Sequence, residues 1–227
     1  MSGERPKRPQ TAQEYVLDEL RRAIVTGELR AGEQIRQDAL AERLGTSRVP
    51  LREALKILEG EGQVSYHPHR GYFVTELSSD DLAEVYRIRA LLEDEAVAVA
   101  VPRLTDADVA ALAEALEAVE TAEREGDIPA LTVANRAFHF GLIELAEMPR
   151  LSRLVRQLWD ATDAYRSVYF AEAGNRERVR AEHRAILAAI EHRDATRTVA
   201  LLRAHREHAV TRVTAVLDQA GSDPSAH

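Results

Sequence analysis

Apolar residues recur every three or four positions through most of the chain, which is the spacing of amphipathic helices. In the first third this pattern predicts helices over residues 11–25 and 38–44, and a third helix that Thr46 or Ser47 caps and that ends near residue 60. The pattern then alternates around a Pro-His-Arg-Gly turn, which predicts short strands over residues 64–66 and 72–75. Three helices followed by a hairpin indicate a winged helix-turn-helix.

From Ser78 onward the helical spacing continues without a strand signal. It predicts six helices, approximately over residues 78–101, 105–125, 128–148, 149–171, 175–192 and 194–219. Short connections predict that consecutive helices run antiparallel. The expected fold class is therefore mainly α: an N-terminal winged helix-turn-helix domain over residues 1–76 and an all-α antiparallel bundle over residues 77–227.

The amino-acid composition is that of a globular protein and excludes some kinds of site. Charged residues make up 30% and hydrophobic residues 45% of the 227 positions, and there is no cysteine, which excludes disulfides and thiolate metal sites. The N-terminus has no apolar leader and no apolar run is long enough to span a bilayer, so we expect a cytoplasmic protein without a membrane partner.

The net charge of −8 lies entirely in the second domain. Residues 1–76 carry 12 Lys and Arg against 12 Asp and Glu, whereas residues 77–227 carry 18 against 26. An acidic total does not exclude DNA as a partner, because one locally basic face is sufficient.

Arg48 and Arg52 lie one turn apart at the start of the third helix, where the helix dipole disfavours cations by roughly 0.3–1 kcal/mol each. In a helix-turn-helix this end enters the major groove, where an arginine that binds guanine gains about 1–3 kcal/mol. Val49 suits a thymine methyl group, and Arg70 and Gly71 suit a minor-groove contact at the hairpin tip. The alternatives are two solvated surface arginines and an ordinary hairpin turn.

Arg89 lies at the centre of an apolar stripe, so it needs a partner. Glu93, one turn further along, is one candidate. The carboxylate of an effector bound inside the bundle is the other.

Three histidines and one asparagine are placed to meet inside the bundle. His183 and His205 lie 11 residues before and after the expected turn at Asp194, which puts them at the same height of an antiparallel hairpin. His139 follows Asn135 by one turn on the apolar side of another helix. Side chains on facing helices can hold a metal in this way. The alternative for each histidine alone is a hydrogen-bonded core position.

Three histidines and a metal also occur in hydrolases, in which Glu182 or Glu144 would be a candidate base. A DNA-binding dimer without an effector is a further alternative. A DNA-binding half joined to a buried site favours a sensor over an enzyme.

The stretch GELRAGEQIRQDALAERLGTSRVPLREALKILEGEGQVSYHPHRGYFV, residues 27–74, resembles the winged helix-turn-helix of the GntR superfamily of bacterial transcription regulators. The resemblance implies DNA contacts by Arg48, Arg52 and Gly71. Val49 stands where members often have Thr, and Asp38 stands where some have Arg.

Residues 79–217 resemble the FCD ligand-binding domain of the FadR subgroup, through RALLE (89–93), NRAFH (135–139), EHRAIL (182–187) and LLRAH (201–205). One recognition helix covers only a few base pairs, so we expect a homodimer on a palindromic operator, controlled by a small organic acid. The resemblance implies a divalent metal ion (zinc, manganese or nickel) held by Asn135, His139, His183 and His205, with Asn135 where many members have Asp.

Overall fold

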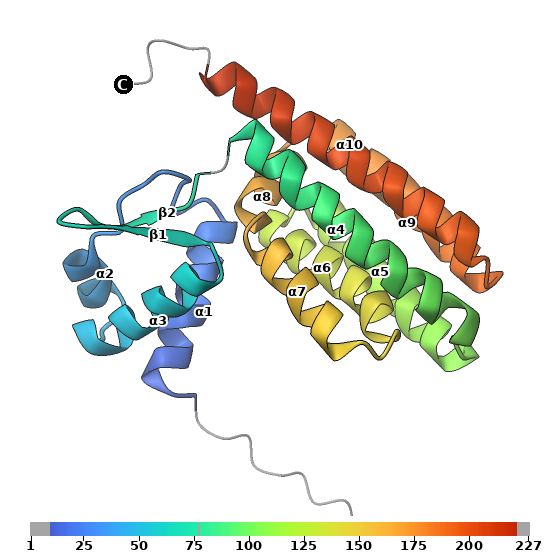
Figure 1. The fold of residues 1–227 in the computed structure, drawn as a ribbon, viewed down its shortest axis with the longest axis horizontal. Coiled ribbons are helices and arrows are strands. Elements are labelled where there is room, and N and C mark those ends of the chain that lie inside the picture. The colour runs from blue at the N-terminus through green and yellow to red at the C-terminus, as the bar shows by residue number, and fades with distance from the viewer. Residues whose placement is uncertain (1–9, 77, 222–227) are drawn as a thin grey trace, which may run out of the picture. The chain divides into compact units, whose positions relative to one another are not determined.

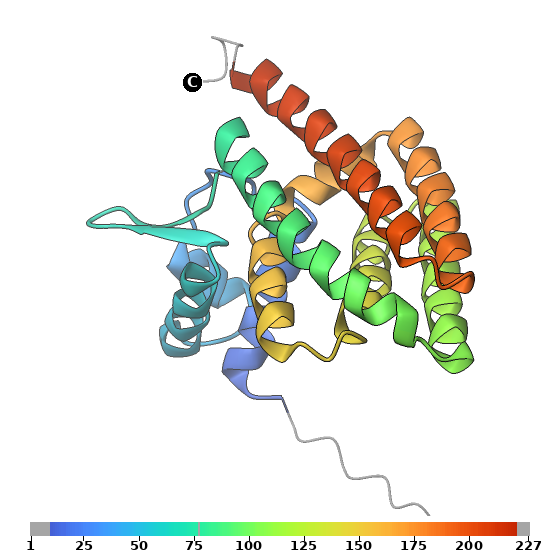
Figure 2. The same ribbon diagram turned by 45° about the vertical axis from the view of Figure 1, so that its right-hand side comes forward.

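The computed structural model describes residues 10–76 and 78–221, and the chain divides into two compact units, Met1–Thr75 and Glu76–His227. The first unit contains helices α1 (Ala12–Val25), α2 (Gln37–Arg43) and α3 (Arg48–Gly60), then strands β1 (Val64–His67) and β2 (Gly71–Val74). The strands pair antiparallel, with Val64 opposite Val74 and His67 opposite Gly71. Figure 1 shows the hairpin lying above α2 and α3, and the turned view of Figure 2 shows it extending beyond the helices of its unit, as a wing does. The predicted winged helix-turn-helix is confirmed.

The core of the first unit forms where α1 packs against α3. Val16 and Leu20 of α1 are buried together with Leu51, Leu55 and Leu58 of α3. The apolar faces that position these residues also fix which face of α3 remains exposed.

A further extended segment, which the sequence pattern did not predict, pairs with strand β2 of the hairpin. Residues 32–35 run along β2, where the Ile35 amide donates to the Tyr72 carbonyl at 2.8 Å and the Val74 amide donates to the Glu33 carbonyl at 2.9 Å. Only Ile35 of this stretch is buried, so the stretch shows no alternation that would mark a strand.

The described residues 78–221 form seven α-helices and one 3-10 helix. They are α4 (Ser79–Ala100), η1 (Val101–Arg103), α5 (Asp106–Glu125), α6 (Ile128–Glu144), α7 (Pro149–Asp160), α8 (Asp163–Ala171), α9 (Ala173–Glu191) and α10 (Ala195–Gly221). Helices α5 and α6 pack closely, as do α9 and α10, while α4 packs mainly on α10. Figure 2 shows α4 and α10 side by side along much of their length.

Two predicted helices were wrong in extent. The one expected over residues 149–171 is broken at Ala161–Thr162, where Thr162 Oγ1 bonds to the backbone carbonyls of Leu158 and Trp159 and the helix restarts as α8. The one expected over residues 128–148 ends at Glu144, and Glu147 in the turn that follows has a left-handed conformation with φ of 54°, which a continuing helix does not allow. None of the described helices combines the length and the apolar character needed to cross a membrane.

Candidate functional site: a recognition helix and a buried histidine cluster

The start of α3 exposes the side chains that the sequence assigned to DNA. Arg48 and Arg52 are exposed and Val49 is 65% exposed. Arg48 Nε forms an ion pair with Asp38 Oδ1 at 2.5 Å, and both side chains remain about 70% exposed to solvent. An ion pair this exposed contributes little energy. A DNA phosphate or base can therefore take the place of Asp38 as the partner of Arg48.

The N-terminus of α3 differs from those of α1, α4 and α5. Those three helices begin with complete capping boxes, at Thr11, Ser78 and Thr105. Ser47 precedes α3 in extended conformation, but within the described residues its side chain makes no capping hydrogen bond. The first amides of α3 are thus available to an anion such as a DNA phosphate.

A groove of about 720 Å³ lies between α3 and the hairpin. Arg48, Arg52, Arg70 and Gly71 line it, as expected. Its other polar lining residues are Asp38 and eight residues that the sequence did not indicate as DNA contacts: Gln34, Arg36, Gln37, Lys56, Glu59, Tyr66, His69 and Tyr72. Five of the lining residues are Arg or Lys and two are acidic, so this face is basic although its domain has no net charge.

The tip of the hairpin depends on two residues with positive φ. His69 has φ of 63° and Gly71 has φ of 88°, and Gly71 is the residue type that this conformation favours. Gln34 Nε2 donates to the Arg70 carbonyl at 2.5 Å, and the Arg70 guanidinium lies 5.1 Å from the Phe73 ring centre. These contacts hold Arg70 at the tip.

Helices α6, α9 and α10 bring three imidazoles together in the second unit. His139, His183 and His205 are 5% exposed or less, and one ligand nitrogen of each lies within 4.8 Å of the other two. His139 Nε2 and His183 Nε2 are 3.1 Å apart. The predicted convergence of the three imidazoles is confirmed.

Burial keeps these imidazoles neutral. Desolvation, together with the neighbouring histidines, lowers the pKa of His139 and His183 well below the ordinary value of 6.5. Desolvation also lowers the pKa of His205, although Glu182 acts in the opposite direction. The guanidinium of Arg166 contributes to the lowered pKa of all three. Neutral imidazoles are the form that binds a metal.

Several buried polar atoms belong to this region. Asn135 Oδ1 and Nδ2, His183 Nδ1 and Tyr169 Oη have no hydrogen-bond partner among the described residues. Asn135 is fully buried one helical turn before His139. Two nitrogens on one tetrahedral zinc, each at about 2.05 Å, lie about 3.3 Å apart, close to the observed separation of His139 and His183. The donor set, and the spacing of His139 and His183, fit a divalent metal.

Glu144 and Glu182, the two candidates for a catalytic base, differ in exposure and in contacts. Glu144 is exposed and pairs with Arg156 at 2.5 Å. Glu182 Oε2 lies 2.7 Å from His205 Nδ1, on the side of that ring away from Nε2. Glu182 therefore contacts the cluster, and Glu144 pairs on the surface instead.

Arg89 is buried and pairs with Glu93, the first of its two expected candidates. Its Nε donates to Glu93 Oε1 at 2.8 Å. Trp159 Nε1 also donates to Glu93 Oε1 at 2.8 Å, and Arg206 Nη1 donates to Glu93 Oε2 at 2.9 Å. Burial raises the pKa of Glu93, but the two guanidiniums outweigh it and lower the pKa overall.

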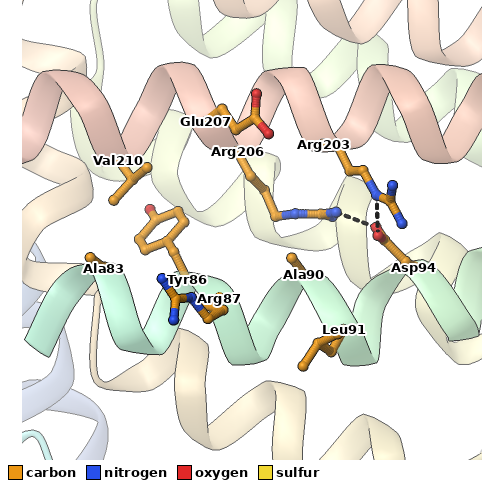
Figure 3. Close-up of a pocket in the computed structure, with 10 residues that line it drawn as sticks. All are labelled: Ala83, Tyr86, Arg87, Ala90, Leu91, Asp94, Arg203, Arg206, Glu207 and Val210. Atoms are coloured by element: carbon orange, nitrogen blue, oxygen red, sulfur yellow. Dashed lines mark hydrogen bonds and ion pairs between the residues drawn. The ribbon is translucent and has the colours of Figure 1, made fainter.

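The ionic network of Arg89, Glu93 and Arg206 lies between two features of the helical unit. One is a groove lined by residues of α4 and α10, and the other is the histidine cluster. Figure 3 shows Arg206 reaching from α10 to Asp94 on α4, in a groove of about 570 Å³. On the inner side, the Trp159 ring centre lies 5.3 Å from that of His139. Sequence reasoning missed Trp159, Arg206, Tyr169 and Arg166. The bonds of Trp159 and Arg206 to Glu93 join residues 66 and 113 positions apart, which no local pattern indicates.

Family models match both units. The model described as bacterial regulatory proteins, gntR family, matches residues 12–74, and the model described as FCD domain matches residues 84–208. Among curated relatives, the HTH-type transcriptional regulator McbR of Escherichia coli is 37% identical over 144 residues, which are 63% of this chain and 65% of McbR. The HTH-type transcriptional repressor GlaR of the same organism is 28% identical over 82% of this chain and 88% of its own length.

Solved structures show the same architecture. That of E. coli McbR/YncC has a TM-score of 0.78 at 30% identity and covers 93% of this chain and 99% of the other. A putative GntR regulator from Rhodococcus sp. RHA1 has a TM-score of 0.78 at 25% identity, over 88% and 96% of the two chains. These relatives and structural neighbours are transcription regulators and not enzymes. The chain belongs to the GntR family of DNA-binding transcription regulators, in the group that carries an FCD domain.

Proposed function

We propose that this protein is a cytoplasmic, homodimeric regulator whose affinity for a palindromic operator is controlled by a small organic acid. In this proposal residues 1–76 bind DNA, and residues 77–227 form the dimer and bind the acid beside a divalent metal. The observation that carries the proposal is the cluster of three buried neutral imidazoles in a chain that also presents a basic recognition helix. A ligand changes DNA affinity only if it prefers one dimer geometry to another.

We assign the operator contacts to Arg48, Val49 and Arg52 in the major groove and to Arg70 and Gly71 at the wing. Arg48 and Arg52 offer bidentate donors to guanine or phosphate, and Val49 offers an apolar contact to thymine. The exposure of these side chains and the basic groove between α3 and the hairpin support the assignment.

Arg52→Ala should weaken operator binding by about 1–3 kcal/mol, because it removes one base or phosphate contact. The exposed side chain has no role in the core, so the melting temperature should stay unchanged. Fluorescence anisotropy with a labelled operator measures the loss, and Arg124→Ala, exposed on α5, is the matched control. Operator binding as tight as that of wild type would contradict the assignment of α3 as the recognition helix.

We propose a dimer because one recognition helix contacts only a few base pairs of DNA. Two such helices spaced by one turn of DNA read a two-fold symmetric site. The described part of the helical unit exposes Leu91, at 70%, and Ile88, at 39%, one turn apart on α4. We assign this face to the contact with a second copy.

Leu91→Asp should therefore convert the protein to monomers at micromolar concentration, because it replaces an apolar contact by a carboxylate that the interface would have to desolvate. Sedimentation equilibrium measures the shift. Val133→Asp, at a comparably exposed position on α6, should leave the dimer intact. A wild-type protein that is monomeric, or a dimer that Leu91→Asp leaves unchanged, would contradict this assignment.

The proposed metal ligands are His139, His183, His205 and Asn135, and the candidate ions are zinc, manganese and nickel. A bound divalent ion would supply a positive centre for an anionic effector, since Asn135 adds no negative charge. Arg166, whose charge acts on all three imidazoles, and Arg89, bound to Glu93, are the proposed cationic partners of the effector carboxylate.

The lowered pKa values of the histidines predict how the metal-free protein responds to pH. Unfolded chains take up protons near pH 6.5, whereas the folded chain keeps these imidazoles neutral to lower pH. The unfolded state thus binds more protons, and the free energy of unfolding should fall as the pH drops below about 6.5. Urea denaturation of the metal-free protein at several pH values measures this. A His183→Gln variant should show a shallower fall, and an equal slope in both proteins would contradict the buried neutral state.

A further inference from the structure

Glu182 places one carboxylate between two imidazoles of α10. Its Oε2 lies 2.7 Å from Nδ1 of His205, and its Oε1 lies 2.6 Å from Nδ1 of His208. The His205 side chain is 6% exposed and the His208 side chain is 45% exposed. The carboxylate therefore connects a histidine of the buried cluster with a histidine at the surface.

The chemistry of the two contacts fixes the direction of the hydrogen bonds. A glutamate side chain that is still 18% exposed and lies within hydrogen-bond distance of two imidazole nitrogens is a carboxylate at neutral pH. An ionised carboxylate accepts hydrogen bonds and cannot donate them. The proton on His205 must then sit on Nδ1, which leaves Nε2 as a lone-pair donor.

We infer that Glu182 is the positioning residue of the histidine cluster: it holds His205 in the Nδ1–H tautomer, sets the affinity of the proposed metal centre, and is itself held by His208. Carboxylates that accept from the far nitrogen of a metal-binding histidine orient the ring and raise its basicity. The effect on metal affinity rests on the metal centre proposed above, while the effect on the tautomer does not.

The same geometry argues against Glu182 as a general base. Both of its oxygens accept from imidazole nitrogens of α10, and it contacts His205 from the side of the ring opposite Nε2. It acts on a ligand through His205 and does not present its own lone pairs to that ligand.

The first test needs no metal. Nitrogen-15 NMR of the metal-free, full-length protein distinguishes the two tautomers of His205 by their long-range couplings. We expect Nδ1–H in wild type and in the matched control Glu177→Leu, an exposed glutamate on the same helix. Glu182→Leu should shift His205 toward Nε2–H. Nε2–H in wild type, or Nδ1–H retained in Glu182→Leu, would overturn the inference, whatever the protein does with metal.

The second test measures zinc affinity by competition with a chromogenic chelator. Glu182→Leu should weaken zinc binding by about 10- to 100-fold, the range typical of lost partners of metal-binding histidines. Glu182→Gln keeps a carbonyl acceptor for Nδ1 and should recover part of the loss, and His208→Ala should cost less than Glu182→Leu.

The melting temperature of the metal-free variants separates positioning from folding. A purely structural role would lower that temperature and leave zinc affinity unchanged, and this result would overturn the inference. A wild-type protein that binds no zinc would contradict the proposed metal centre, and the tautomer measurement would then decide the role of Glu182 alone.

Discussion

Replacement of His183 and His205 together by alanine is expected to abolish zinc binding. Two of the three imidazoles disappear, and His139 with Asn135 cannot hold a divalent ion alone, because structural and catalytic zinc sites keep at least three protein ligands. In wild type, binding to the folded state alone should raise the free energy of unfolding by about 2.7 kcal/mol when free zinc exceeds the Kd a hundredfold. In the double variant zinc should leave the free energy of unfolding unchanged.

The measurement is the difference in melting temperature with and without zinc, taken for each protein separately. This difference is independent of any stability that the alanines cost the metal-free fold. The control His67→Ala/His192→Ala removes two histidines outside the cluster and should keep the full zinc effect. Asn135→Asp should tighten zinc binding, since it adds an anion beside the ion. An equal zinc effect in the double variant and in wild type would show that the metal binds elsewhere.

Removal of the Glu93 carboxylate is expected to cause the largest loss of stability. Glu93→Ala removes the carboxylate that the buried Arg89 and Arg206 share, although Arg206 keeps its ion pair with Asp94, and breaking a buried ion pair on one side costs about 3–5 kcal/mol. It also takes the acceptor from the indole nitrogen of Trp159. Urea denaturation of the full-length protein measures the loss as a fall in the free energy of unfolding.

The control for this experiment lies two residues further along the same helix. Glu95 is exposed, so Glu95→Ala should change the free energy of unfolding by no more than about 0.5 kcal/mol. Restoration of stability in the triple variant Glu93→Leu/Arg89→Met/Arg206→Met would show that the cost comes from keeping the two guanidiniums buried without the Glu93 carboxylate. A loss below about 1 kcal/mol in Glu93→Ala would contradict the buried network.

The histidine cluster could be predicted because its geometry depends on local spacing. His183 and His205 are equally far from the turn at Asp194, and an antiparallel pair of helices converts equal spacing into equal height. The recognition helix was predictable for a similar reason, since its apolar face fixes which side Arg48 and Arg52 occupy.

The contacts that sequence reasoning missed depend on packing between distant segments. Arg206 and Glu93 are separated by 113 positions, and nothing local indicates that α10 lies along α4. The apolar spacing continues through Ala161–Thr162, so no local pattern marks the break between α7 and α8. The strand-like pairing of residues 32–35 could not be predicted, because this stretch reads GEQI and has no alternation of apolar and polar residues.

Metal content is the most direct measure of the proposed effector site. Elemental analysis of the purified, dialysed full-length protein, followed by reloading with zinc, manganese or nickel, gives the bound metal per chain. We expect about one equivalent of one of these ions, held by the three buried imidazoles. Less than about a tenth of an equivalent after reloading would contradict the metal centre and leave His139, His183 and His205 as a buried polar cluster.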